Sequence, residues 1–200
     1  ILDLGANIGI SLIWFKEKYP QSSILAFEAD PFIFSYLKLN TSNLSNVTIK
    51  NEAVWSEDTT LSFASDGGDA GRVSDDGDVQ EKTVSVEAKD IKLILKEHGP
   101  FDFIKMDIEG HELDVLQASL DVIRQLQPLI IIEISRMNCG STQSQRQLQS
   151  FLQAANYKIV TIKHGGEKEE TLEDLFAEVN ALPPTHEMIG NYAMLPITSQ

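Results

Sequence analysis

The first nine residues of the chain, ILDLGANIG, constrain its fold more than any other stretch. A short apolar run ends at Gly5, a turn leads to Gly9, and an apolar stretch with helical periodicity begins at Ile10. This order predicts a buried strand, a glycine loop and the start of a helix. Gly5 permits a backbone conformation that other residues disfavour, and it lets a ligand approach the main chain. The helix N-terminus then directs free N–H groups and the positive end of its dipole at that ligand.

The spacing of the glycines favours one kind of ligand. Dinucleotide sites use G-x-G-x-x-G and seat a pyrophosphate on the helix N-terminus, whereas Gly5 and Gly9 are separated by three residues with Asn7 between them. Asn7 adds a polar side chain without extra room for a diphosphate, and Asp3 would repel phosphate. A cationic nucleoside without phosphate, such as S-adenosylmethionine, fits better. We expect Asn7 to hold the loop or contact the ligand. The buried acid Asp3 is expected either to accept hydrogen bonds from loop or ligand, or only to brace the turn.

A second acid strengthens this interpretation. Residues 23–28 have the apolar pattern of a buried strand that ends at Glu28, and Glu28 follows the glycine loop by about 20 residues, the spacing at which nucleotide-binding α/β folds place a ribose-binding acid. A carboxylate can accept hydrogen bonds from both ribose hydroxyls. The alternative is a solvated acid at a strand end, but the combination with the glycine loop favours ribose binding.

The order of predicted elements indicates an α/β fold. Asp30 and Pro31 form a typical helix start, with an N-cap aspartate and proline at the first helical position. Strands and helices alternate, which predicts a parallel sheet with right-handed crossovers. We find no internal repeat or domain boundary, so residues 1–200 are expected to form a single domain, one that lacks an N-terminal segment because the chain opens inside a strand. The main predicted strands are 23–28, 47–50, 59–64, 101–106, 129–134, 157–163 and 191–197.

Composition excludes several classes of function. The net charge of −14 argues against nucleic acid and anionic membrane surfaces as partners, because binding to phosphates needs lysine and arginine. No apolar run reaches the roughly 20 residues of a membrane helix. The single cysteine, Cys139, excludes an internal disulfide and a cysteine-based zinc site; we expect a reducing, cytoplasmic setting. Residues 66–82 are rich in acids and glycines, and they are interpreted as a solvated loop or as a lid over the substrate.

Three blocks of sequence together resemble the FkbM family of S-adenosylmethionine-dependent methyltransferases. They are DLGANIG at 3–9, AFEADP at 26–31 and FDFIKMDIEGHE at 101–112, and they occur in the family's order. The resemblance implies a Rossmann-like class I methyltransferase fold, with a mostly parallel seven-stranded sheet, helices on both faces and an antiparallel last strand. It implies methyl transfer to a hydroxyl oxygen of a saccharide or small metabolite. It also places Glu52 and Ala53, after the third strand, beside the adenine. The chain departs from many relatives at Ala29, where they carry proline.

The third block supplies the candidate catalytic residues. Asp107 follows an apolar strand at the carboxyl edge of the predicted sheet, where open α/β sheets bind ligands. Asp107, Glu109 and His111 are therefore expected to line the acceptor side, where one of them removes the hydroxyl proton. Glu133, on the next strand, is expected near the same edge; an Asp107–Glu133 pair offers oxygen ligands to a metal ion, but we expect no metal. Two alternatives stay open, a methyltransferase of protein or nucleic acid and a non-catalytic cofactor-binding module. The acceptor and the oligomeric state are not specified by the sequence.

Overall fold

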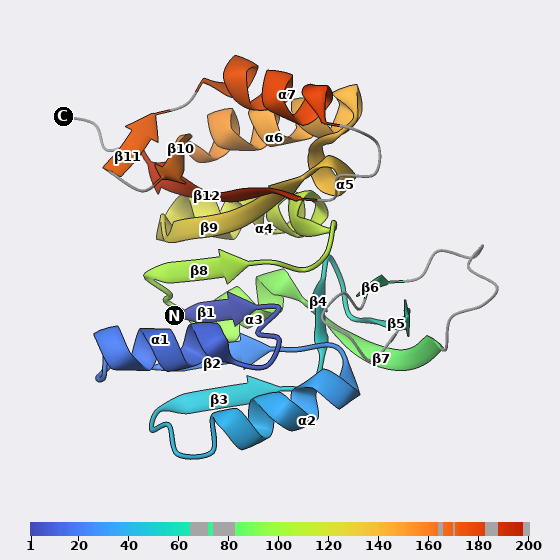
Figure 1. Cartoon of the computed structure of the whole chain (residues 1–200), viewed down its shortest axis with the longest axis vertical. Helices are drawn as coiled ribbons and strands as arrows, with labels where there is room; N and C mark the ends of the chain where they lie inside the picture. The colour runs from blue at the N-terminus through green and yellow to red at the C-terminus, as the bar shows by residue number, and fades with distance from the viewer. Residues whose placement is uncertain (65–71, 74–82, 164–165, 170, 183–187, 198–200) are drawn as a thin grey trace.

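The computed structural model describes residues 1–64, 72–73, 83–163, 166–169, 171–182 and 188–197. Its main sheet has eight strands in the order β11-β10-β12-β9-β8-β1-β2-β3 (Figure 1). All neighbouring pairs from β9 to β3 are parallel, and β12 is antiparallel to both β9 and β10. The strands are β1 (Leu2–Leu4), β2 (Ile24–Phe27), β3 (Val47–Lys50), β8 (Phe103–Met106), β9 (Leu129–Ser135), β10 (Tyr157–Lys163), β11 (Gly166–Glu169) and β12 (Met188–Pro196).

The predicted fold class is confirmed. Seven strands, from β10 to β3, form the expected mostly parallel sheet, and the last strand, β12, is the antiparallel one. β11 is an addition that the sequence did not predict, because its four residues, GEKE, have no apolar pattern; it pairs with β10 at the edge of the sheet.

A second, smaller sheet has the order β4-β7-β5-β6 and lies beside the carboxyl ends of the parallel strands (Figure 1). It consists of β4 (Ala53–Trp55), β5 (Thr59–Ala64), β6 (Arg72–Val73) and β7 (Thr83–Asp90). The predicted strand 59–64 therefore belongs to this sheet. Apart from β6, the acidic loop 66–82 lies outside the described residues, so its interpretation as a lid stays a prediction.

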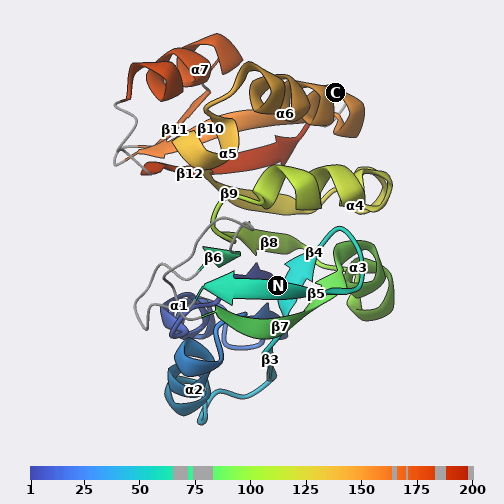
Figure 2. The ribbon, with the colours of Figure 1, turned by 90° about the vertical axis from the view of Figure 1, so that its right-hand side faces the viewer.

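Helices cover both faces of the main sheet, as Figure 2 shows for α1 and α2 on one side and α3 and α4 on the other. One core cluster joins α1 and α2 to the inner strands through Leu12, Phe15, Ala26 and Leu37. A larger cluster packs the opposite face against α3, α4, α6 and α7. The helices are α1 (Ile10–Lys18), α2 (Pro31–Asn40), α3 (Ile91–His98), α4 (Glu112–Leu126), α5 (Arg136–Cys139), α6 (Thr142–Ala155) and α7 (Leu172–Ala181).

The topology positions the candidate site. β1 lies between β2 and β8, with Leu4 opposite Phe27 on one side and Met106 on the other. The residues that follow these three strands, the glycine loop, Glu28 and Asp107, therefore meet at one edge of the sheet. This edge is where open α/β sheets bind their ligands.

Candidate functional site

The glycine loop is held by backbone hydrogen bonds to the end of β2. The N–H groups of Gly5 and Ala6 both donate to the carbonyl of Phe27, at 3.0 and 2.9 Å. Gly5 has a φ of 78°, and a Cβ placed there would lie 1.8 Å from the carbonyl oxygen of Asp107. Only glycine permits this close approach, so Gly5 is required where the loop after β1 meets the loop after β8.

The helix that follows begins without a side-chain cap. Its N-cap residue is Gly9, at a φ of 91°, and the Asn7 side-chain oxygen accepts instead from the N–H of Ile8 at 2.7 Å. The N-terminus of α1 thus presents backbone donors and the positive end of the helix dipole beside the loop. Such an end binds anionic groups, a ligand carboxylate included.

Glu28 holds two loops together with its carboxylate. One oxygen accepts from the N–H of Asn7 at 2.8 Å and the other from the N–H of Asp30 at 2.9 Å. The side chain is largely buried, and burial raises its pKa against the opposing effect of these two hydrogen bonds. A carboxylate has about four acceptor positions, so two remain for a ligand's hydroxyls.

The residues after β3 lie next to Glu28. The amide of Asn51 donates to the carbonyls of Glu28 and Ala29, at 2.9 and 3.1 Å. Glu52 follows, half-buried, and Ala53 is buried at the start of β4. The structure therefore brings Glu52 and Ala53 to the side of the glycine loop on which Glu28 lies.

Asp3 is fully buried beneath the loop. Its carboxylate accepts from the Ser11 hydroxyl on α1 and forms an ion pair at 3.5 Å with Lys105 of β8. The Lys105 ammonium also donates to the Gly5 carbonyl at 3.0 Å and to Asp107 at 3.1 Å. Burial lowers the pKa of Lys105, but Asp3 and Asp107 outweigh it and raise the pKa above its ordinary value. These contacts agree with the brace that the sequence left open as one role for Asp3.

The loop after β8 is the second part of the site, and it adopts a strained conformation. Glu109 and Gly110 both have left-handed backbones, with φ of 57° and 101°. For glutamate this conformation is unfavourable and persists only where the surroundings impose it. Here the buried Glu112 imposes it, because its carboxylate accepts from the N–H groups of Ile108 at 2.8 Å and Gly110 at 3.1 Å.

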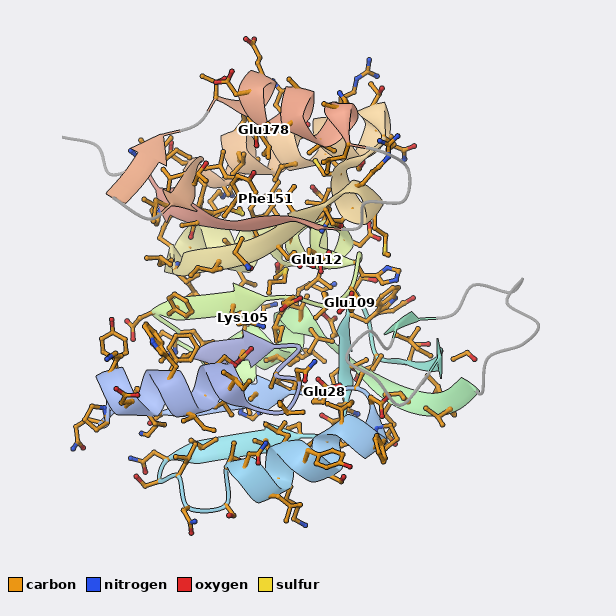
Figure 3. The ribbon with its side chains drawn as sticks, viewed as in Figure 1. Glu28, Lys105, Glu109, Glu112, Phe151 and Glu178 are labelled. Atoms are coloured by element: carbon orange, nitrogen blue, oxygen red, sulfur yellow. The ribbon has the colours of Figure 1, made fainter. Side chains whose placement is uncertain are left out.

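Glu112 also links this loop to the end of β9. The Asn138 amide donates to Glu112 at 2.7 Å and to the Glu133 carbonyl at 2.9 Å. In Figure 3, Glu28, Glu109 and Glu112 gather at the edge of the sheet that faces the small sheet, whereas Glu178 lies at the far end of the molecule. The loop after β8 is thus fixed by a buried network of side chains and not by its own backbone alone.

His111 stands at the N-cap of α4, and its ring packs against Trp55 of the small sheet. The two ring centroids are 4.5 Å apart, with the planes tilted by 60°. Trp55 is partly exposed, so the small sheet contributes an aromatic surface beside His111. The structure therefore brings all three predicted catalytic residues, Asp107, Glu109 and His111, into one segment at the expected edge.

Glu133 lies on β9 beside this segment. Since Met106 pairs with Ile132, the next pair along these parallel strands places Glu133 beside Asp107. Burial and then the negative charges of Asp107, Glu109 and Glu112 raise the pKa of Glu133 to about 7, with Lys105 partly opposing them.

Sequence reasoning gave no role to four of these residues, Lys105, Glu112, Asn138 and Trp55. A signal existed for Lys105, because a buried acid such as Asp3 needs a cation and Lys105 is the basic residue of the predicted strand 101–106. Asn138 and Trp55 carry no such signal, since they reach the site from elements that are distant in the sequence.

The described ranges lack both a cluster of metal ligands and a membrane-spanning helix. They contain no group of three or more histidine, cysteine, aspartate and glutamate side chains placed to hold a metal ion. Among the described helices, none is both long enough and apolar enough to cross a bilayer.

Comparison with known proteins gives consistent matches. Residues 3–159 match the family model described as the methyltransferase FkbM domain. Methyltransferase 1 of Beauveria bassiana (strain ARSEF 2860) is 29% identical over 158 residues, covering 67% of this chain and 64% of that protein. Methyltransferase sdnD of Sordaria araneosa is 30% identical over 153 residues, covering 59% of each. The chain thus spans about six tenths of the length of these curated relatives.

A solved structure shows the same fold. The crystal structure of methyltransferase FkbM from Methylobacillus flagellatus KT superposes with a TM-score of 0.54 at 18% identity, covering 82% of this chain and 40% of that one. At this identity the likeness concerns the fold alone, a Rossmann-like class I arrangement.

Proposed function

The chain belongs to the methyltransferase FkbM domain family, and on that premise we propose that it transfers a methyl group from S-adenosylmethionine to a hydroxyl oxygen. The acceptor is a saccharide or another small metabolite. The same methyl transfer is proposed for any longer protein that contains this domain.

The observation that carries the proposal is the Glu28 carboxylate beside the glycine loop. Its two backbone hydrogen bonds, to Asn7 and Asp30, fix its position and leave acceptor positions for both ribose hydroxyls. The Gly5–Gly9 loop, held at 3.0 Å or less from the end of β2, provides the close main-chain approach that a nucleoside needs. These residues therefore fit an adenosyl group.

In this proposal, residues near Glu28 bind the other parts of S-adenosylmethionine. The N-terminus of α1 binds the donor's carboxylate, Glu52 and Ala53 flank the adenine, and Asp3 supports the loop from beneath through Ser11. When bound, S-adenosylmethionine supplies an electrophilic methyl group on a positively charged sulfur. The carboxylates of this edge, in a chain of net charge −14, favour that cation and disfavour a dinucleotide.

Asp107, Glu109 and His111 line the acceptor side in this proposal. The Trp55 and His111 rings give a surface against which the apolar face of a ring-shaped acceptor packs. The carboxylates of Asp107 and Glu109 accept hydrogen bonds from the hydroxyls of a saccharide. Most of the rate enhancement then comes from alignment of the acceptor and exclusion of water. With Cys139 as a buried single thiol, a reducing, cytoplasmic setting goes with this assignment.

Calorimetry and a turnover screen test the proposal. S-adenosylmethionine is expected to bind with micromolar affinity and NAD is not. Transfer of a labelled methyl group is then measured on a panel of saccharides and hydroxylated metabolites, with a structured RNA and a mixed peptide library as the competing classes. Micromolar binding of NAD with none of the methyl donor would overturn the donor assignment, and transfer only to RNA or peptide would overturn the acceptor class.

A further inference from the structure

The carboxylates at the acceptor edge differ in how the protein holds them. Asp107 accepts a hydrogen bond from the Lys105 ammonium at 3.1 Å. Glu112 is fully buried and accepts from Ile108, Gly110 and Asn138. Both carboxylates therefore accept hydrogen bonds from protein donors.

Glu133 is held only through its backbone. Its carbonyl accepts from Asn138 at 2.9 Å, whereas no donor within the described ranges forms a hydrogen bond with its carboxylate. The side chain is half-buried and lies beside Asp107 at the carboxyl end of β9. It has both access to the acceptor edge and acceptor positions that no protein group uses.

The charges around Glu133 favour proton uptake. Asp107 and Glu109 face it from the loop after β8, Glu112 faces it from α4, and Lys105 of β8 is the cation that partly offsets them. From β12, the residue opposite Glu133 is the uncharged Asn191. Together with burial, these carboxylates hold the Glu133 pKa at about 7, which suits a base that works near neutral pH.

We propose that Glu133 is the general base of the reaction, the group that takes the proton from the acceptor hydroxyl. This inference rests on the proposed function. The hydroxyl oxygen forms a bond to the methyl carbon while the carbon–sulfur bond breaks and its electron pair stays on sulfur, which becomes a neutral thioether. The hydroxyl proton passes to a Glu133 carboxylate oxygen and then to solvent, so the products are the methyl ether, S-adenosylhomocysteine and one proton.

The geometry gives the neighbouring candidates other roles. Asp107 is tied to Lys105 and acts as a positioning residue, and the His111 ring is packed against Trp55. Lys105 links the proposed donor side to the proposed acceptor side, because its ammonium donates to the Gly5 carbonyl in the glycine loop and to Asp107 in the loop after β8. Of these groups, Glu133 combines an uncommitted carboxylate with access to the edge.

Two measurements on the intact chain test the proposal. In protein labelled with carboxyl-¹³C glutamate, one signal is expected to titrate near pH 7 in the wild type and to be missing in Glu133→Gln. Single-turnover rates against pH, with the best acceptor of the panel, should rise through an apparent pKa near 7 in the wild type. Glu133→Gln should abolish that rise and lower the rate at pH 8 by about 10²-fold or more, with affinity for S-adenosylmethionine within twofold.

Two further variants separate a base from a structural role. Asp107→Asn should slow turnover but keep the pH-dependent rise, displaced to lower pH because a negative neighbour is removed. Glu178→Gln, on the exposed face of α7, should change neither signal nor rate. An unchanged pH profile in Glu133→Gln, or no glutamate signal that titrates near neutral pH, overturns the assignment of the base while leaving the proposed function standing. Absence of wild-type turnover on every acceptor, with the glutamate signal present, instead overturns the proposed function.

Discussion

The proposed donor half of the site, around Glu28, and the proposed acceptor half, around Glu133, differ in what surrounds these two carboxylates. In the proposed donor half, Glu28 accepts from the N–H groups of Asn7 and Asp30, and Asp30 accepts from the N–H of Phe32 at the start of α2. In the proposed acceptor half, the negative charges of Asp107, Glu109 and Glu112 act on Glu133, and the Lys105 cation partly offsets them. Like charges at close range disfavour ionisation, whereas hydrogen bonds to the charged form favour it.

The difference suggests a division of labour. Hydrogen bonds from the backbone keep the donor half in one geometry, which suits recognition of a constant ligand. In the proposed acceptor half, burial and the neighbouring carboxylates raise the pKa of Glu133 to about 7, which suits proton transfer near neutral pH. Lys105 contacts both halves, so its removal should affect them together.

Lys105→Met has the largest expected effect. It leaves Asp3 fully buried without its cation, and removal of one partner from a buried ion pair costs about 3–5 kcal/mol. The free energy of unfolding from urea titrations should fall by that amount at pH 8 and by less at lower pH, because burial raises the pKa of the Asp3 carboxyl. The matched control is Lys18→Met, which removes an exposed lysine from a surface pair with Glu17 and should cost less than about 0.5 kcal/mol. An equal loss of unfolding free energy in Lys105→Met and Lys18→Met would show that the buried Asp3–Lys105 pair stabilises the fold no more than an exposed pair does.

Glu112→Gln should have the next largest effect. The amide replaces one carboxylate oxygen with a donor that faces Ile108 N–H or Asn138, so about 2–3 kcal/mol of stability should be lost. Thermal unfolding measures this as a decrease of roughly 4–12 °C for a chain of this size. Glu178→Gln serves as the exposed control. If Glu112→Gln and Glu178→Gln both have the melting temperature of the wild type, Glu112 does not hold the strained loop after β8.

The pH dependence of stability should show the smallest effect. The Glu133 pKa of about 7 in the folded chain exceeds the ordinary glutamate value of 4.5, so the folded state binds the proton more tightly between these two pH values. Stability should therefore fall as pH rises from about 5 to 8, and Glu133→Gln should remove part of that decrease. Because the carboxylate is only half-buried, solvent screening reduces the difference to the order of 1 kcal/mol. Urea titrations at pH 5 and pH 8 measure the free energy of unfolding. An identical decrease between these pH values in the wild type and in Glu133→Gln would contradict the raised pKa of Glu133.

The sequence predicts the donor half better than the acceptor half, for a physical reason. Gly5, Asp30 and Pro31 act through local backbone conformation, and a parallel sheet necessarily brings the ends of neighbouring strands together. The fold was therefore predictable. Trp55 and Asn138 reach the site through tertiary packing, which leaves no local pattern. The burial of Asp3 implied a partner, but only the register of β1 against β8, with Asp3 opposite Lys105, identifies it.

Calorimetry of S-adenosylmethionine binding to Glu28→Gln determines whether Glu28 belongs to a site for the methyl donor. Glu57→Gln, which changes an exposed glutamate of the small sheet region, is the matched control. Loss of charged hydrogen bonds worth about 1.5–3 kcal/mol should raise Kd roughly 10- to 100-fold in Glu28→Gln and leave the control unchanged. Melting temperature is measured on the same samples. A Glu28→Gln protein that is folded and binds the donor within twofold of wild type would show that Glu28 does not bind the ribose of the donor.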